Sequence, residues 1–79
     1  MILIGDIGNT DTKICLLNSK YRIVKRFVLP TKKINKALLK RKLNFIIKKK
    51  IYINKSLFCS VVPNQFLLIK SFIHKNLKS

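Results

Sequence analysis

Apolar positions at the start of the chain fall into two short runs that predict a β-hairpin. The runs are Met1–Ile4 and Ile14–Leu17, separated by the polar, turn-prone string Gly8-Asn9-Thr10-Asp11. A second turn signal, Asn18-Ser19-Lys20, follows, and the apolar residues after it recur at alternate positions until Val24-Lys25 breaks the alternation. We therefore expect three antiparallel strands in a meander, with a bulge in the third strand at that break.

The hydrophobic period changes after Pro30-Thr31, where apolar residues begin to repeat at spacings of three and four. This stripe consists of Ile34, Leu38, Leu39, Leu43, Ile46 and Ile47. It predicts one amphipathic helix from about Lys32 to about Lys50, with Thr31 as its N-cap. The run Lys48-Lys49-Lys50 would complement the negative end of that helix.

The last part of the sequence predicts one more strand and one more helix. Ser56–Val62 is a nearly continuous apolar run, which we interpret as a strand buried on both faces. After Pro63-Asn64 the apolar residues repeat at helical spacing: Phe66, Ile69, Ile73 and Leu77. The element order is β-β-β-α-β-α, an α/β fold. Because a crossover helix precedes the fourth strand, it should run parallel to the first, with helices covering the sheet.

Composition limits the class of protein. The chain has 79 residues, enough for one small domain, and 48% of them are hydrophobic, with only 2 Gly and 2 Pro, which excludes a disordered chain. No apolar run approaches the roughly 20 residues that span a bilayer, and no signal-like leader precedes Gly5-Asp6. We expect a cytoplasmic protein without a membrane partner. Cys15 and Cys59 lie in apolar runs without metal-ligand spacing, so we interpret both as small core residues.

The charge balance is extreme and has two explanations. Lys and Arg number 18 against 2 acids, a formal net charge of +16, which favours a polyanionic partner. However, 15 Lys, 12 Ile and 7 Asn dominate the composition, and all three residue types have codons rich in A and T. The excess of basic residues can therefore result from the base composition of the genome as well as from selection for binding.

The residues best suited to ligand binding are those that closely follow the first apolar run, Asp6-Ile7-Gly8-Asn9-Thr10-Asp11-Thr12-Lys13. Gly8 permits close approach of backbone N–H groups to an anion, and Asn9 tolerates the left-handed conformation that a hairpin turn can need. Thr10 and Thr12 offer hydroxyl donors, and Lys13 offers a positive charge. Such a turn can hold a phosphate, with Asp6 holding Mg²⁺ through water. It is not a P-loop, and turns of this composition are also common for purely structural reasons.

Two short motifs resemble a known family. Asp6-Ile7-Gly8-Asn9-Thr10, six residues into the chain, is similar to the N-terminal phosphate motif of type III pantothenate kinases, and Cys59-Ser60-Val61-Val62-Pro63 is similar to their Ser-Val-Val-Pro stretch. That family belongs to the superfamily of acetate kinase, sugar kinases, actin and the large heat-shock chaperones. The resemblance implies a ribonuclease H-like β-β-β-α-β-α half-domain, with residues 1–79 forming part of an N-terminal nucleotide-binding domain and the second domain absent.

The resemblance also implies an activity, which is phosphorylation of pantothenate by ATP, the first step of coenzyme A biosynthesis. Residues 6–13 would lie at the ATP phosphates with Mg²⁺. The family's catalytic aspartate, its monovalent-cation site for K⁺ or NH₄⁺, and most of its pantothenate contacts are expected after residue 79, and its enzymes are homodimers. Asp6 and Asp11 are the only acids here, so we expect a truncated chain that is inactive alone.

Two other classes of function stay open at this point. A small basic nucleic-acid-binding protein would use the lysine-rich helix, and nonspecific binding at low salt is expected for any chain of this charge. Against sequence-specific binding, the basic residues lie on every predicted element and no RNA-binding or recognition-helix motif is present. The amphipathic basic helix could also lie on a membrane surface, although its apolar stripe is needed to cover the sheet. The single histidine, His74, is interpreted as a solvated surface residue.

Overall fold

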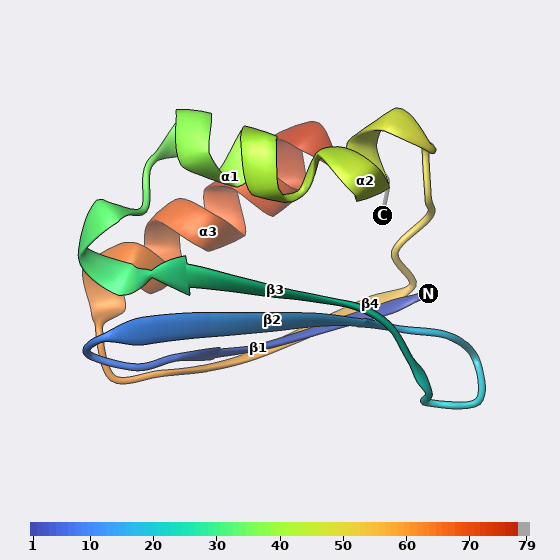
Figure 1. The fold of residues 1–79 in the computed structure, drawn as a ribbon, viewed down its shortest axis with the longest axis horizontal. Coiled ribbons are helices and arrows are strands. Elements are labelled where there is room, and N and C mark those ends of the chain that lie inside the picture. Colours follow the sequence, from blue (N-terminus) through green and yellow to red (C-terminus); the bar gives the residue numbers. More distant parts are fainter. Residues whose placement is uncertain (78–79) are drawn as a thin grey trace.

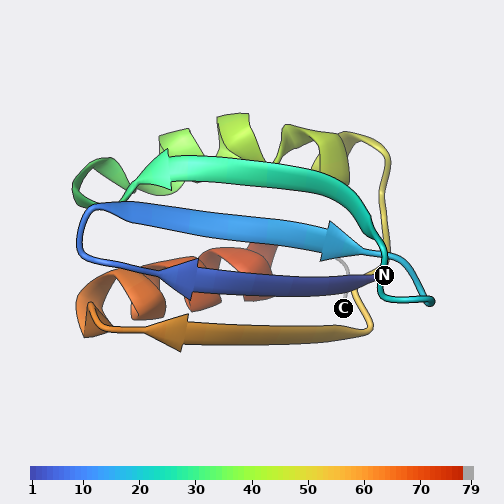
Figure 2. The same ribbon diagram turned by 60° about the horizontal axis from the view of Figure 1, so that its bottom comes forward.

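The chain forms a four-stranded mixed sheet with helices packed on it, as Figures 1 and 2 show. The computed structural model describes residues 1–77. Its strands, in the spatial order β3-β2-β1-β4, are β1 (Ile2–Ile7), β2 (Asp11–Leu17), β3 (Ile23–Pro30) and β4 (Lys55–Ser60). β1 pairs with β2 antiparallel and with β4 parallel, and β2 pairs with β3 antiparallel. The predicted α/β class, the meander and the parallel fourth strand are confirmed.

The bulge predicted in the third strand is also present. Leu16 pairs with Lys25 and Leu17 pairs with Ile23, so Val24 has no partner in β2. The turn before it is stabilised by Asn18, whose Oδ1 accepts hydrogen bonds from the backbone N–H groups of Lys20 and Arg22 at 2.9 and 3.1 Å. β3 starts at Ile23, directly after this turn.

The single helix predicted from Lys32 to Lys50 is wrong, because three shorter elements occupy this stretch. They are the 3₁₀ turn η1 (Thr31–Lys33), α1 (Lys36–Lys42) and α2 (Asn44–Lys48). The N-cap of α1 is Asn35, whose side chain accepts the Leu38 N–H at 2.8 Å, and not Thr31. Leu43, at φ −94° and ψ 13°, separates α1 from α2. The predicted stripe still faces the sheet, because the short elements keep its apolar residues on one side.

The last helix, α3 (Pro63–Asn76), matches the prediction closely. Pro63 begins it, a position where the missing N–H of proline costs nothing. Together with α1 and α2 it buries a continuous core against the sheet. The fully buried large side chains of this core are Leu3, Ile7, Ile14, Leu16, Leu29, Leu39, Leu43, Ile46, Ile53 and Ile69.

All helices lie on one face of the sheet and leave the other face uncovered (Figure 2). The expectation that β4 is buried on both faces is therefore wrong, since β4 is an edge strand and Leu57 is 58% exposed. The two cysteines are not core residues either, because Cys15 is half-buried and Cys59 is exposed, and both are free thiols. Alternation along each strand sends one apolar set to the helices and the other set to the uncovered face.

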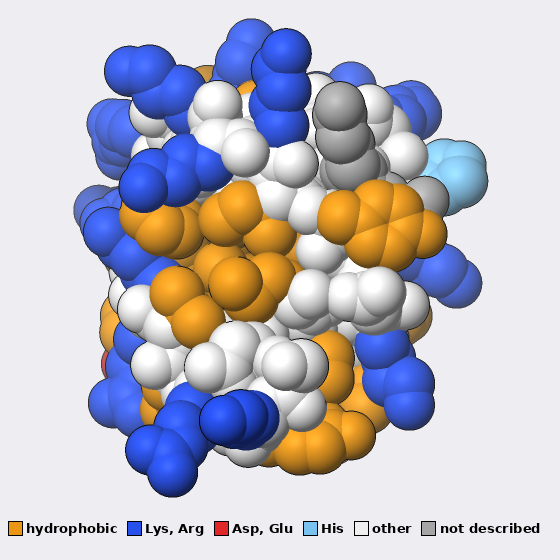
Figure 3. Space-filling model, turned by 90° about the vertical axis from the view of Figure 1, so that its right-hand side faces the viewer, with side chains coloured by type: hydrophobic (Ala, Val, Ile, Leu, Met, Phe, Trp, Pro, Cys, Tyr) orange, Lys and Arg blue, Asp and Glu red, His pale blue; other side chains and the backbone are white. Residues whose placement is uncertain are grey.

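Basic side chains cover the molecule widely. Figure 3 shows lysine and arginine side chains all round an apolar area on one face. No helix within residues 1–77 is long and apolar enough to cross a membrane.

Candidate functional site

The hairpin between β1 and β2 forms the tip of the sheet and contains the predicted phosphate loop. The Gly8 N–H donates to the Asp11 carbonyl at 3.0 Å, which closes the loop and leaves Asn9 and Thr10 exposed at its tip. A Cβ at Gly8 would lie 3.1 Å from that same carbonyl oxygen, so the loop closes tightly around a glycine. The expected left-handed conformation at Asn9 is wrong, since positive φ among residues 1–77 occurs only at Tyr21 and Lys50.

Strand alternation divides the predicted site residues between two faces. Asp6 and Lys13 are cross-strand neighbours, and both are exposed on the uncovered face, together with Asp11. The side chains of Ile7 and Thr12 point into the core on the helix side, each with 0% exposure. The residues that can meet a ligand through their side chains are therefore Asp6, Asn9, Thr10, Asp11 and Lys13.

Thr31 fixes the hairpin to the rest of the fold. Its N–H donates to the Thr10 carbonyl at 2.9 Å, and its hydroxyl lies 2.8 Å from the hydroxyl of Thr12 in a buried pair. Its carbonyl oxygen accepts the side-chain amide of Gln65, from the first turn of α3, at 2.7 Å. Sequence reasoning marked Thr31 as a boundary but assigned it to a helix cap, and it missed Gln65, for which the sequence carries no signal.

The buried hydroxyl pair predicts a measurable coupling. Thr12→Val leaves the Thr31 hydroxyl without its partner and should lower the free energy of unfolding by about 1 to 2 kcal/mol. The double variant Thr12→Val/Thr31→Val should cost less than the sum of the two single changes, as measured by urea denaturation. The exposed Thr10→Val is the matched control and should change stability by less than about 0.5 kcal/mol. Strict additivity of the two buried changes would contradict this assignment.

The two sequence motifs meet at the hairpin end of the sheet. The Val61 N–H donates to the Ile7 carbonyl at 3.1 Å, directly before the loop. Ser60 Oγ accepts the Val62 N–H at 3.0 Å, which turns the chain from β4 into α3. No side chain among residues 1–77 caps the N-terminus of α3. Because Pro63 has no N–H, the groups left without a side-chain cap beside the hairpin are the Asn64 and Gln65 N–H groups, at the positive end of the helix dipole.

Gly5 is a second glycine that the site requires. A side chain at this position would overlap the ring of Phe58, the residue opposite Gly5 in β4. The ring thus occupies the space above Gly5 on the helix side and holds β4 against β1, one residue before Asp6. Sequence reasoning gave Gly5 only a place at the end of a strand.

An open hollow of about 520 Å³ lies on the uncovered face beside Asp6. Its lining includes Asp6, Lys13 and the apolar side chains Ile4 and Leu57. Within residues 1–77, no group of three or more His, Cys, Asp or Glu residues could hold a metal ion by itself. His74 is exposed, as expected for a surface residue.

Comparison with known proteins identifies the family. The family model described as type III pantothenate kinase matches residues 2–79. The chain belongs to the type III pantothenate kinase family. A protein of Pelagibacter ubique (strain HTCC1062) named type III pantothenate kinase is 56% identical over 75 residues. The match covers 95% of this chain but 30% of that relative, so this chain represents less than a third of the length of that type III pantothenate kinase.

Proposed function

We propose that this chain forms the N-terminal nucleotide-binding part of a type III pantothenate kinase, the enzyme that transfers phosphate from ATP to pantothenate. The observation that carries the proposal is the hairpin of residues 6–13, held by Thr31 and placed beside the free N-terminus of α3. Family membership over residues 2–79 supports the reaction class. On this proposal the chain is cytoplasmic and has no membrane partner.

The hairpin offers an anion two kinds of partner. The first N–H groups of α3 lie at the positive end of a helix of 14 residues, a common setting for phosphate groups. The exposed Asn9 amide, Thr10 hydroxyl and Lys13 ammonium can add hydrogen bonds and positive charge. Phosphoryl transfer depends mostly on positioning and charge neutralisation, and this end of the sheet supplies part of both.

The carboxylate of Asp6 fits a Mg²⁺ ion held through water. Mg²⁺ typically keeps several waters and uses one or two carboxylates together with substrate phosphates. Asp6 offers one exposed carboxylate at the hairpin end of the sheet, where the phosphates would lie. When bound, Mg²⁺ would neutralise charge on the phosphate oxygens. Lys13, directly opposite Asp6 in β2, would limit the repulsion between the Asp6 carboxylate and an incoming phosphate.

Residues 6–13 do not supply every group that the reaction needs. Asp6 and Asp11 both belong to the hairpin, so no other carboxylate is available to take the proton of the pantothenate hydroxyl. We propose that the catalytic base, the monovalent-cation site and the dimer contacts belong to the other two thirds of the enzyme. The chain by itself should therefore not phosphorylate pantothenate.

A chimera provides the direct test. The 75-residue segment of the Pelagibacter ubique kinase that matches this chain is replaced by the corresponding residues of this chain, and ATP-dependent phosphorylation of pantothenate is measured. We expect a kcat within about tenfold of that of the parent enzyme, because local interactions set the hairpin and its support. The isolated chain should show no turnover in the same assay. A soluble, folded chimera without activity would contradict the proposal.

A further inference from the structure

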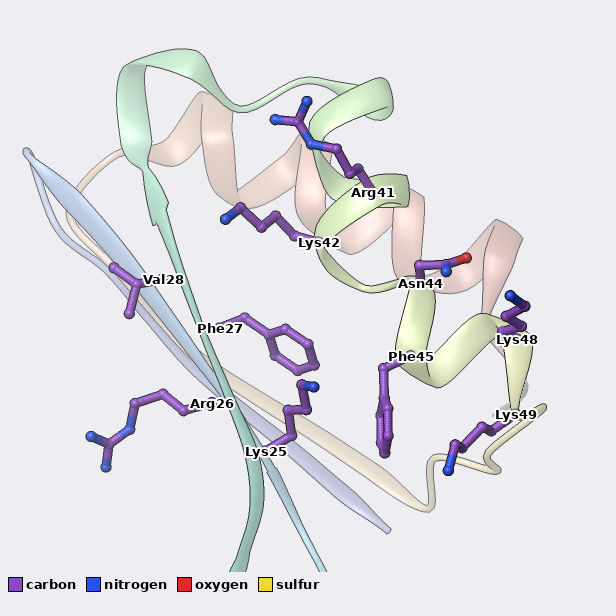
Figure 4. A pocket seen from close by; sticks show the side chains of 10 residues that line it. All are labelled: Lys25, Arg26, Phe27, Val28, Arg41, Lys42, Asn44, Phe45, Lys48 and Lys49. Carbon is purple, nitrogen blue, oxygen red and sulfur yellow. The ribbon is translucent and has the colours of Figure 1, made fainter.

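A groove separate from the hairpin runs between the edge strand β3 and the α1–α2 segment. Its volume is about 660 Å³, and Figure 4 shows its lining side chains. Five of its six basic residues lie on the helix side of β3: Lys25, Arg41, Lys42, Lys48 and Lys49. The sixth, Arg26, points from β3 toward the uncovered face of the sheet. We propose that this groove binds single-stranded nucleic acid through its phosphates, with a base stacked on Phe45.

The charge of the groove is not compensated within the described residues. No acid lines it, because Asp6 and Asp11 both lie at the hairpin. A partner that brings several phosphates would release the counterions that these cations attract, and this release is the main source of affinity for nucleic acids. Lysines scattered over the other elements raise the positive potential around the whole molecule, whereas this groove concentrates positive charge in one recess.

Phe45 distinguishes the groove from a simple basic patch. Its ring is half-buried, and the ammonium groups of Lys25 and Lys49 each lie 4.8 Å from the ring centroid. Figure 4 shows the two lysines on either side of the ring. Phosphates that pair with these ammonium groups would draw them from the ring and free an aromatic face for a base. Cations around an aromatic platform are the usual arrangement in proteins that bind single strands.

The shape of the groove favours a single strand over the other polyanions. Proteins usually read a duplex by inserting a helix or ribbon into its grooves, whereas these cations line a recess that a flexible strand can enter. An acidic peptide would pair with the free edge of β3 and would need apolar pockets for alternate side chains. Apart from Phe45, no exposed apolar side chain points into the groove, because Phe27 is buried and Val28 points toward the uncovered face of the sheet.

The proposal is tested by fluorescence anisotropy with a labelled oligothymidylate of about 12 nucleotides, titrated with the full chain between about 50 and 200 mM salt. The groove variant Arg41→Gln/Lys48→Gln should weaken binding by about tenfold or more and reduce the steepness of the salt dependence. The matched control Lys20→Gln/Lys75→Gln removes the same charge from exposed positions outside the groove. It should weaken binding by less than about threefold, because these two charges contribute only to the positive potential around the whole molecule.

The aromatic ring is tested separately. Phe45→Leu should weaken binding by about fivefold or more with little change in the salt dependence, while Phe45→Tyr should retain affinity. Equal losses in the groove and control pairs would overturn the proposal, as would equal binding of a duplex of the same length or equally effective competition by polyglutamate. If Phe45→Leu altered the circular dichroism spectrum, the exposed pair Arg41 and Lys48 would decide the outcome.

Discussion

Replacing Asp6 with asparagine in the chimeric kinase should lower kcat by about 100-fold or more. Asparagine keeps the size of the side chain but removes the negative charge that would hold hydrated Mg²⁺ at the ATP phosphates. Asp6 is exposed and no buried contact depends on its carboxylate, so the fold should not change. The loss should appear in kcat more than in the KM for pantothenate, since pantothenate would be bound elsewhere. Steady-state kinetics of the purified chimera measure both constants.

Two further variants separate a role in the reaction from a general effect of charge. Asp6→Glu keeps the carboxylate with one more methylene and should recover part of the lost activity. Lys55→Gln removes an exposed charge at the far end of β4 and should leave kcat within about twofold. If Asp6→Asn and Lys55→Gln had similar small effects, the proposed role of Asp6 would be refuted.

Replacing Gly5 with valine should destabilise the chain by about 3 kcal/mol, the upper end of the range for overpacking. The new side chain would overlap the Phe58 ring, and β1 lies between β2 and β4, so its backbone has little room to move. A folded chain of 79 residues has a total stability of about 4 to 12 kcal/mol. The variant should therefore unfold at a much lower urea concentration, as followed by circular dichroism.

A second change on β4 tests the cause of this loss. Phe58→Ala removes the ring from the space above Gly5, so Gly5→Val should cost less than about 1 kcal/mol in that background. Phe58→Ala alone provides the reference for this comparison. The same penalty in both backgrounds would mean that backbone propensity, rather than the contact with Phe58, causes the effect.

The elements and their pairing could be predicted where hydrophobic period and turn residues agree. The bulge at Val24 followed from a broken alternation, and α3 followed from helical spacing after Pro63. The helix break at Leu43 could not be predicted in this way, because the apolar stripe has the same period on both sides of it. β4 was assigned to the interior because an apolar run does not reveal whether a partner covers its second face.

The candidate site was predictable in position but not in detail. Residues 6–13 form the hairpin as expected, yet the sequence does not reveal that Thr12 points inward to Thr31. The partner is 19 residues away in the sequence, and only the β2–β3 register brings the two hydroxyls together. The overlap between Gly5 and Phe58 likewise depends on the parallel pairing of β1 with β4.

The uncovered sheet face and the free edges of β3 and β4 determine how concentrated solutions of the chain should behave. Open strand edges promote pairing between copies, and a net charge of +16 opposes it by colloidal repulsion. At 1 M salt the Debye screening length falls to about 3 Å, so the repulsion between copies is largely removed. The same salt does not weaken apolar contacts. Washing with concentrated salt, the usual way to strip nucleic acid from a basic protein, is thus the purification step at which this chain is most prone to aggregate.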